Sequence, residues 1–309
     1  MAEFLEMRDI VKRFPGVLAL NHVHLSVRKG EVHALLGENG AGKSTLMKIL
    51  SGAYHKDEGE ILIDGQAVDI RSSADAQRLG ISIIYQELNL TEQLTVAENI
   101  FMGRPIMKNA LMVDWSAMFR EAQKLLDELG VEINARSLIR DLGVAHKQMV
   151  EVAKALSINA RILVMDEPTA PLTNREIDTL FGIIRMLKER GVAIIYISHR
   201  LEEVKEICDR ATIMRDGKNI TAVDVGDVTI DEIIHHMVGR ERNRPTDPFT
   251  GGNSTNAKSA SLPAMGMGGA KFLASFTTPG RRRNWALRRC RSQSCPPSRP
   301  SSRRRRYRR

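Results

Sequence analysis

The chain has 309 residues, of which 42% are apolar, enough for the core of one large domain or of two smaller ones. Its formal net charge of +9 is uneven, because residues 281–309 hold thirteen arginines and no acid, whereas residues 1–280 carry a net charge of −4. No apolar run approaches the roughly 18 residues of a membrane span, and the start lacks the apolar centre of a signal peptide, so we expect a soluble protein.

The first predicted elements surround a glycine-rich motif. The sequence GENGAGKST, residues 37–45, follows an apolar run typical of a buried strand (32–36) and precedes a helical pattern (43–50). Glycines in this setting let backbone N–H groups approach phosphate oxygens at the positive end of a helix. A chance glycine turn is the alternative, but the strand–motif–helix context favours a phosphate-binding loop. Lys43 would then reach the β- and γ-phosphates, and the Ser44 hydroxyl would ligate Mg²⁺.

A mostly helical region follows, at about 90–157. The segments DWSAMFREAQKLLDELG and HKQMVEVAKALS carry apolar residues at helical spacing. This pattern differs from the alternation of strands and helices on either side. We therefore expect a helical subdomain inserted into an α/β domain.

Strand patterns return with ILVMDEP (162–168) and VAIIYISH (192–199). The segment between them is predicted to be a helix, because apolar residues recur at Ile177, Leu180, Phe181, Ile184 and Leu187. Thr173 and Glu176 stand three residues apart at its start, as in a capping box. Strand, helix and strand in this order predict an α/β sheet with right-handed crossovers.

Two adjacent acids end the strand of ILVMDEP. A carboxylate at the carboxyl end of a buried strand lies where α/β sheets bind ligands. Asp166 is suited to organise Mg²⁺, and Glu167 is suited to act as the base that orients the attacking water. An Asp-Glu pair in isolation is more often a helix cap, but downstream of a phosphate-binding loop the functional interpretation is favoured.

Five motifs in register identify a family resemblance: GENGAGKST, YQELNL, DLGVAHKQMVEVAKAL, MDEPTAPLT and YISH. Their order and spacing are similar to those of the nucleotide-binding domain of ABC transporters. The resemblance implies an α/β P-loop NTPase fold of the ABC type, with an inserted helical subdomain and an N-terminal antiparallel β region. It implies that the domain spans residues 1–241 and binds ATP and Mg²⁺.

The resemblance also implies roles for single residues. Gln86 matches the glutamine that touches the metal and senses the permease, and Phe14 matches the aromatic residue that stacks on adenine. His199 matches the histidine that contacts the γ-phosphate. The implied catalytic residues are Lys43, Glu167 and His199. The implied metal ligands are Ser44, Gln86 and Asp166. The implied nucleotide contacts are Phe14, Gly37, Glu38, Asn39, Gly40, Ala41, Gly42, Lys43, Ser44, Thr45, Gln86, Leu142, Gly143 and Val144.

A finer resemblance, over residues 4–241, is to the ATP-binding subunits of bacterial monosaccharide importers for ribose, galactose, xylose or allose. It is carried by FPGVLALNHVHLSVRKGEVHALLGENGAGKSTLMKILSG, GISIIYQELNLTEQLTVAENIFMGR and YISHRLEEVKEICDRATIMRDGK. The resemblance implies an ATPase that energises sugar import from the cytoplasmic face of the inner membrane. The implied partners are membrane permease subunits and, indirectly, an extracytoplasmic sugar-binding protein.

Two positions depart from the family pattern. Gly143 stands where the signature loop usually has a serine, whose hydroxyl would donate to the γ-phosphate of the opposing site. Losing that hydrogen bond costs roughly 1.5–3 kcal/mol, so we expect this signature loop to bind the ATP of the opposing site more weakly. Pro171 stands where members usually have a small residue, and proline removes a backbone N–H and fixes φ.

Domains of this family act as pairs, because each ATP lies between one P-loop and the signature loop of the other domain. In the sugar-import group both domains are fused in one chain of about twice the length recognisable here. The resemblance therefore implies a truncated chain that needs a second nucleotide-binding domain, in cis or in trans.

The region 242–309 has no periodicity and is rich in Arg, Ser, Pro and Gly. A nucleic-acid-binding arm, a disordered linker and translation in a shifted frame are the three readings. The tail has no lysine after Lys271, and residues 281–309 have only Trp285 and Tyr307 as aromatic residues, so we expect no specific nucleic-acid partner. We favour the shifted frame, because GC-rich DNA read out of frame yields Arg, Pro, Ser, Ala and Gly, and because the pattern is lost abruptly after a well-matched domain.

Two other functions compete with sugar import. An ABC-type ATPase acting on nucleic acid would carry a coiled coil or zinc-binding cysteines, and neither occurs between Lys43 and Asp166. An inert fragment that binds ATP without turnover is the other alternative. Measuring ATP hydrolysis at high chain concentration separates an ATPase that works as a pair of chains from a fragment that binds ATP without turnover.

Overall fold

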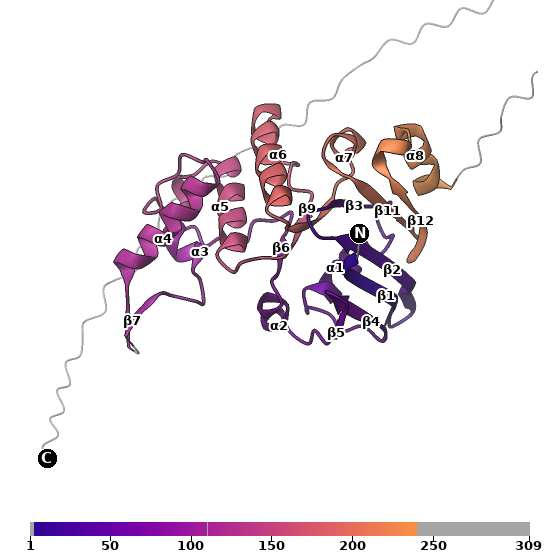
Figure 1. Cartoon of the computed structure of the whole chain (residues 1–309), viewed down its shortest axis with the longest axis horizontal. Coiled ribbons are helices and arrows are strands. Elements are labelled where there is room, and N and C mark those ends of the chain that lie inside the picture. Colours follow the sequence, from indigo (N-terminus) through magenta and orange to yellow (C-terminus); the bar gives the residue numbers. More distant parts are fainter. Residues whose placement is uncertain (1–2, 110, 240–309) are drawn as a thin grey trace, which may run out of the picture. The chain divides into compact units, whose positions relative to one another are not determined.

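The computed structural model describes residues 3–109 and 111–239, and its central feature is a six-stranded sheet (Figure 1). Neighbouring strands run parallel except at one edge of the sheet, where β12 (Lys218–Asp224) pairs antiparallel with β11 (Arg210–Arg215). In spatial order the strands are β12 (Lys218–Asp224), β11 (Arg210–Arg215), β3 (Val32–Leu36), β10 (Ala193–Ile197), β9 (Ile162–Asp166) and β6 (Ile81–Ile84). The three strands predicted from apolar runs, β3, β9 and β10, are confirmed.

An antiparallel sheet at the N-terminus packs against the central sheet. Its strands, in the order β2-β1-β4-β5, are β2 (Val17–Arg28), β1 (Glu3–Phe14), β4 (Glu58–Ile63) and β5 (Gln66–Val68). The pairing of β1 with β2 shifts register between Met7 and Ile10. Asp9 lies at this irregularity with φ of 51°, and His22 lies at the next one, between Ile10 and Lys12, with φ of 52°; non-glycine residues rarely adopt such values. The N-terminal antiparallel region implied by the family resemblance is therefore present.

Helices occupy the region between β6 and β9. The elements there are α3 (Val96–Ile100), α4 (Trp115–Glu128), η1 (Ile139–Asp141) and α5 (Val144–Leu156). The helices α3, α4 and α5 pack on one another. A short ribbon of β7 (Met107–Asn109) and β8 (Met112–Val113) interrupts them, and the sequence did not predict it because its strands are too short to show a period. The limits of the subdomain, 90–157, stay a prediction.

The central sheet separates two apolar clusters, and the alternation of side chains along its strands explains why. In β10, Ile194 and Tyr196 pack among the helices, whereas Ile195 and Ile197 pack against α1 (Lys43–Leu50) and the antiparallel sheet. Both faces are therefore buried, as the continuous apolar runs predicted. Figure 1 shows α6 (Asn174–Glu189) and α7 (Leu201–Ile207) on one side of the sheet and β1, β2 and α1 on the other.

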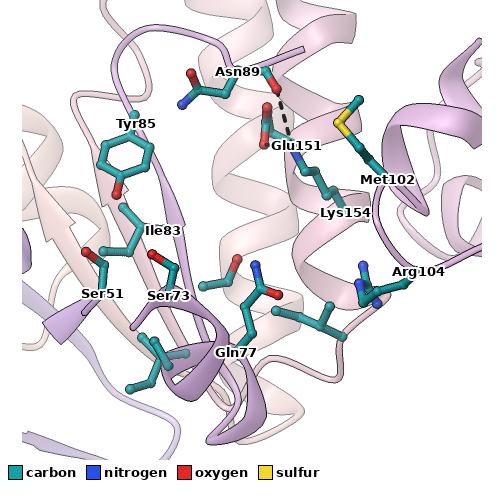
Figure 2. A pocket seen from close by; sticks show the side chains of 14 residues that line it. Ser51, Ser73, Gln77, Ile83, Tyr85, Asn89, Met102, Arg104, Glu151 and Lys154 are labelled. Carbon is teal, nitrogen blue, oxygen red and sulfur yellow. Dashed lines mark hydrogen bonds and ion pairs between the residues drawn. The ribbon is translucent and has the colours of Figure 1, made fainter. Parts of the chain in front are cut away.

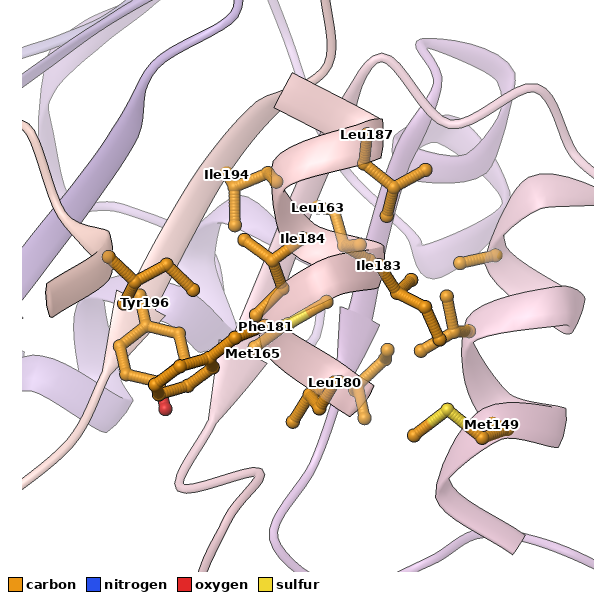
Figure 3. Close-up of a cluster of buried hydrophobic side chains, with 14 of the residues drawn as sticks. Met149, Leu163, Met165, Leu180, Phe181, Ile183, Ile184, Leu187, Ile194 and Tyr196 are labelled. Atoms are coloured by element: carbon orange, nitrogen blue, oxygen red, sulfur yellow. The ribbon is translucent and has the colours of Figure 1, made fainter. Parts of the chain in front are cut away.

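The helices that complete the domain are α1 (Lys43–Leu50), α2 (Ser73–Arg78), α6 (Asn174–Glu189), α7 (Leu201–Ile207), η2 (Val225–Asp227) and α8 (Ile230–Val238). Helix α6 lays an apolar stripe, including Phe181 and Ile184, over β9 and β10 (Figure 3). At its start the Glu176 carboxylate accepts hydrogen bonds from the backbone N–H and the hydroxyl of Thr173, at 2.8 and 2.7 Å. The predicted capping box is thus confirmed, and it fixes where the loop after β9 ends.

Residues 240–309 lie outside the described part of the chain, and so does the predicted tail 242–309. The limits 1–241 of the predicted domain also stay a prediction. Among the described residues, no helix is long and apolar enough to cross a membrane.

Candidate functional site

The carboxyl ends of four parallel strands bring the predicted site residues to one edge of the central sheet. β3 runs into the loop 37–42, β10 ends two residues before His199, β9 ends at Asp166, and β6 ends two residues before Gln86. The pairing of Ile197 with Asp166 puts the ends of β10 and β9 level. Ligands of α/β sheets bind at this edge, so the topology alone gathers these residues.

Two glycines shape the loop between β3 and α1. A Cβ at Gly37 would overlap the backbone carbonyl oxygen of Met214, and one at Gly42 would lie 2.8 Å from the Leu20 side chain. Their φ values, 149° and 101°, also disfavour any other residue. The loop therefore lies close against β2 and β11 and begins α1 with free backbone N–H groups, as an anion site requires.

The Lys43 ammonium is held inside this loop. Its Nζ donates to the carbonyl oxygens of Gly37 at 2.6 Å and Glu38 at 3.1 Å. Partial burial lowers the pKa of Lys43, and the charges of Asp166 and Glu167 oppose that lowering. Lys43 is thus a partly desolvated cation that faces the acids at the end of β9, and these are the properties expected of a phosphate-binding lysine.

The two acids at the end of β9 have different environments. Partial burial and the charge of Glu167 raise the pKa of Asp166, while Lys43 and Lys48 oppose the rise. The Glu167 carboxylate lies 3.2 Å from Nδ1 of His199, so the predicted base and the predicted γ-phosphate contact are neighbours. Glu167 is one-quarter exposed and His199 two-thirds exposed, which leaves both accessible to a substrate and water.

The backbone at Glu167 is unusual. Its φ of 47° lies in the left-handed region, where a non-glycine residue is strained. Its N–H donates to the carbonyl oxygen of Ile197 at 2.9 Å, which ties the loop after β9 to the end of β10. No pattern in the sequence predicted this strain.

A pocket beside the phosphate-binding loop is large enough to be a nucleotide site. Its lining is formed by Val17, Leu18, Ala19, Asn39, Gly40, Ala41, Gly42, Lys43, Ser44, Thr45, Asp216 and Gly217. Sequence reasoning missed the contribution of β2, where Val17 is 60% exposed and Leu18 46% exposed. No sequence pattern marked these two residues, because their place in the pocket follows from contacts between segments that are distant along the chain.

Phe14 does not line this pocket. Its ring packs edge-on against Tyr54, with centroids 5.4 Å apart, and the Lys12 ammonium lies 5.6 Å from the ring centre. The stacking of Phe14 on adenine therefore stays a prediction. Val17 and Leu18 are the largest of the apolar side chains that line the pocket, which also include Ala19 and Ala41.

Gln86 is exposed in the segment that follows β6. Its neighbour Tyr85 lines a second pocket, a groove between α2 and β6 on one side and α3 and α5 on the other (Figure 2). Within the groove the Lys154 ammonium donates to the backbone oxygen of Asn89 at 3.4 Å, a contact marked in Figure 2. Glu151 is buried there, and burial raises the pKa of its carboxyl. Sequence reasoning did not single out this groove.

The predicted signature residues, Leu142, Gly143 and Val144, lie apart from the phosphate-binding pocket. Gly143 occupies the N-cap position of α5, where it has no side chain to accept a hydrogen bond from the first turn, and Val144 is exposed. A Cβ at Gly143 would meet no atom within 4 Å, and its φ of −66° suits any residue. The structure therefore presents this loop to solvent, with room for the serine hydroxyl that it lacks.

Pro171 is exposed in the turn between Glu167 and α6. The turn forms two backbone hydrogen bonds, from Ala170 to Glu167 and from Leu172 to Thr169, and neither needs the N–H that proline lacks. The substitution is therefore compatible with the local backbone.

The donor set fits Mg²⁺ bound together with a nucleotide. The described residues include no group of three or more His, Cys, Asp and Glu side chains arranged to hold a metal. A cation here would instead combine the Asp166 carboxylate and the Ser44 hydroxyl with phosphate oxygens, the hard oxygen ligands that Mg²⁺ prefers. Relief of the unfavourable burial of Asp166 would favour such binding.

Comparison with known proteins identifies the region around this site. Residues 20–170 match the family model described as ABC transporter. The chain is 58% identical over 240 residues to a ribose import ATP-binding protein of Rubrobacter xylanophilus, an alignment that covers 78% of this chain and 48% of that relative. It is 52% identical over 242 residues to a xylose import ATP-binding protein of Moorella thermoacetica, with the same two coverages.

Solved structures give the same fold. The ADP conformation of an ATP-binding cassette of an ABC transporter superposes with a TM-score of 0.68 at 27% identity, covering 78% of this chain and all of that one. A nucleotide-free cassette gives 0.66 at 26% identity, covering 78% and 96%. The predicted ABC-type P-loop fold is confirmed. The chain spans about half the length of the curated relatives that it matches.

Proposed function

From the ABC transporter domain that this chain carries, we propose that the protein binds and hydrolyses ATP to drive the import of a monosaccharide through a membrane permease. The observation that carries the proposal is the position of Lys43. Its ammonium is fixed on the phosphate-binding loop and interacts with Asp166 and Glu167. The names of the sugar-import relatives support the transported substrate class.

Binding of ATP would use the loop 37–45. Backbone N–H groups at the start of α1 and the Lys43 ammonium would neutralise the phosphates, while Val17 and Leu18 would offer apolar surface within the same pocket. Ser44 and Asp166 would hold Mg²⁺, with Gln86 as a further ligand. The ion supplies positive charge that stabilises the developing charge on the phosphates.

Hydrolysis would use Glu167 and His199. The Glu167 carboxylate accepts a proton from the attacking water as the water oxygen forms a bond to the γ-phosphorus. The bond between the γ-phosphorus and the bridging oxygen of the β-phosphate breaks, which yields ADP and phosphate. His199, 3.2 Å from Glu167, would contact the γ-phosphate and hold the carboxylate in place. The strained backbone of Glu167 is consistent with this role, because such strain is concentrated at functional positions.

Completion of the site would need a second nucleotide-binding domain. The start of α5, with the exposed Gly143 and Val144 and the half-buried Leu142, would cover the ATP held by an opposing domain. The chain spans about half of its relatives' length, and that domain would come from a further part of the same polypeptide or from another chain.

The permease would bind beside Gln86. The groove lined by Tyr85, Met102 and Lys154 joins the segment after β6 to the helical region, so a partner seated there would act on both (Figure 2). This binding would place the chain at the cytoplasmic face of the inner membrane. An extracytoplasmic sugar-binding protein would be an indirect partner, reached only through the permease.

A nucleic-acid function is not favoured, because the named relatives are import proteins. The test of the proposal is a pair of measurements on the purified chain, calorimetric binding of Mg-ATP and release of phosphate. Saturable binding with turnover supports an ATPase, whereas saturable binding without turnover at any concentration supports the inert fragment. Absence of ATP binding contradicts both.

A further inference from the structure

A buried carboxylate on α7 connects the two loops that carry the predicted catalytic residues. Glu203 is only 7% exposed. Its Oε2 accepts hydrogen bonds from the hydroxyls of Thr169 at 2.8 Å, Tyr196 at 2.8 Å and Ser198 at 3.0 Å. Its Oε1 accepts from Nη1 of Arg200 at 3.2 Å. A buried charge needs such partners, and here all three hydroxyls are buried as well.

The three hydroxyls come from different places. Thr169 lies two residues after Glu167 in the loop that follows β9, and Ser198 directly precedes His199. Tyr196 lies inside β10 and belongs to the apolar core. Burial and the charge of Glu203 raise the pKa of the Tyr196 phenol, so this group stays a donor. One oxygen atom therefore joins the Glu167 loop, the His199 loop and the core.

The Glu167 loop requires an anchor of this kind. Glu167 has a left-handed backbone that its side chain disfavours, and such a conformation persists only where its surroundings impose it. One restraint is the hydrogen bond from its own N–H to Ile197. The bond from Thr169 to Glu203 is a second restraint, on the other side of Pro168, which has no N–H to donate.

We propose that Glu203 is a positioning residue for hydrolysis, which holds the Glu167 carboxylate beside His199 through the hydroxyls of Thr169 and Ser198. Glu203 lies buried behind the loops and takes no part in ATP binding. This inference rests on the proposed function. It predicts that loosening the Thr169 bond slows turnover and leaves the affinity for ATP unchanged.

A matched pair of variants separates positioning from stability. Thr169→Val and Tyr196→Phe each remove one buried hydroxyl that donates to the same oxygen at 2.8 Å. Both leave Glu203 with one fewer donor, so both should lower the thermal midpoint. Only the first releases the loop of Glu167. Thr169→Ser keeps the hydroxyl and serves as the conservative rescue.

The first readout is the rate of phosphate release from bound Mg-ATP, together with the calorimetric affinity. We expect Thr169→Val to slow release about ten- to hundredfold at unchanged affinity, as displacement of a reacting group by about 1 Å does. Tyr196→Phe and Thr169→Ser should stay within about twofold of the original chain. Equal rates in Thr169→Val and Tyr196→Phe would overturn the proposal.

The second readout needs no turnover. Exchange of the Glu167 amide proton with solvent, followed by NMR, reports the bond to Ile197 directly. It should accelerate at least about tenfold in Thr169→Val relative to Tyr196→Phe at matched temperature below the midpoint. Unchanged exchange in Thr169→Val contradicts the anchor. Accelerated exchange in a chain that never hydrolyses ATP supports the anchor and rejects the proposed function instead.

Discussion

The edge of the central sheet and the start of α5 are both implied to touch ATP, yet they are built in opposite ways. At the sheet edge, glycines without room for a Cβ, a partly buried lysine and a strained Glu167 restrict one another. At the start of α5, Gly143 is exposed, uncapped and surrounded by open space. On the proposed function, the sheet edge would be a half-site built within one chain, whereas the start of α5 would contribute to a site only when a second domain is present.

Replacing Glu167 should have the largest effect. Glu167→Gln keeps the shape of the side chain and removes the proton acceptor, so turnover should fall about 10²- to 10⁴-fold while Mg-ATP still binds. Phosphate release and calorimetry measure the two quantities. Full turnover by this variant would remove Glu167 from the mechanism and end the contrast between the two regions.

Replacing Lys43 should weaken binding itself. Lys43→Ala removes charge-assisted hydrogen bonds to the phosphates, and we expect the affinity for ATP to fall about 10- to 150-fold, or roughly 1.5–3 kcal/mol. Lys147→Ala is the matched control, since Lys147 lies in α5 and pairs with Glu92 at 2.9 Å. Equal losses in both variants would show that the sheet edge is not the binding half-site.

Replacing Asp166 should change the stability of the fold, by less than the two preceding substitutions change turnover and binding. Its folded-state pKa lies above its ordinary value of 3.8, so its favourable contribution is complete below about pH 3.8 and is lost as the pH rises through the higher folded pKa. At pH 7, Asp166→Asn should therefore stabilise the nucleotide-free chain by roughly 1 kcal/mol, about 2–4 °C in thermal midpoint. It should also abolish stabilisation by Mg²⁺ in the presence of ATP.

Thermal scans with ATP, with and without Mg²⁺, test this prediction. A variant that is less stable than the original chain at pH 7, or that keeps the full Mg²⁺ effect, contradicts the assigned role of Asp166. Asp216→Asn is a useful control, because Asp216 is an acid that lines the pocket beside the loop 37–45 and does not lie at the end of β9.

The sequence predicted the sheet edge better than the surroundings of the site. Lys43 and Asp166 lie in motifs whose spacing fixes both strand and loop, and the capping box of Thr173 and Glu176 marked the start of α6. Local patterns determine such features. The exposed Val17 in the pocket and the buried Glu203 depend on contacts between distant segments, which local patterns do not record.

Gly143→Ser should have the smallest effect on the isolated chain. The site has room for the side chain, and a serine N-cap can accept a hydrogen bond from the first turn of α5, so we expect a gain of a few tenths of a kcal/mol. The affinity of the chain for ATP should not change, because on the proposed function this loop would serve the opposing site. Denaturant unfolding and calorimetry measure both. Tighter ATP binding by dilute chains of the variant would place the loop at the chain's own site.

The most direct test of the central claim is the rate of phosphate release as a function of chain concentration, with Mg-ATP saturating throughout. If the sheet edge binds ATP and a second chain's α5 completes the site, the rate should rise with the square of the concentration while the chains are dilute. A rate strictly proportional to concentration would show that one chain suffices. Saturated binding without any turnover would show that this chain cannot complete the site with its own copies.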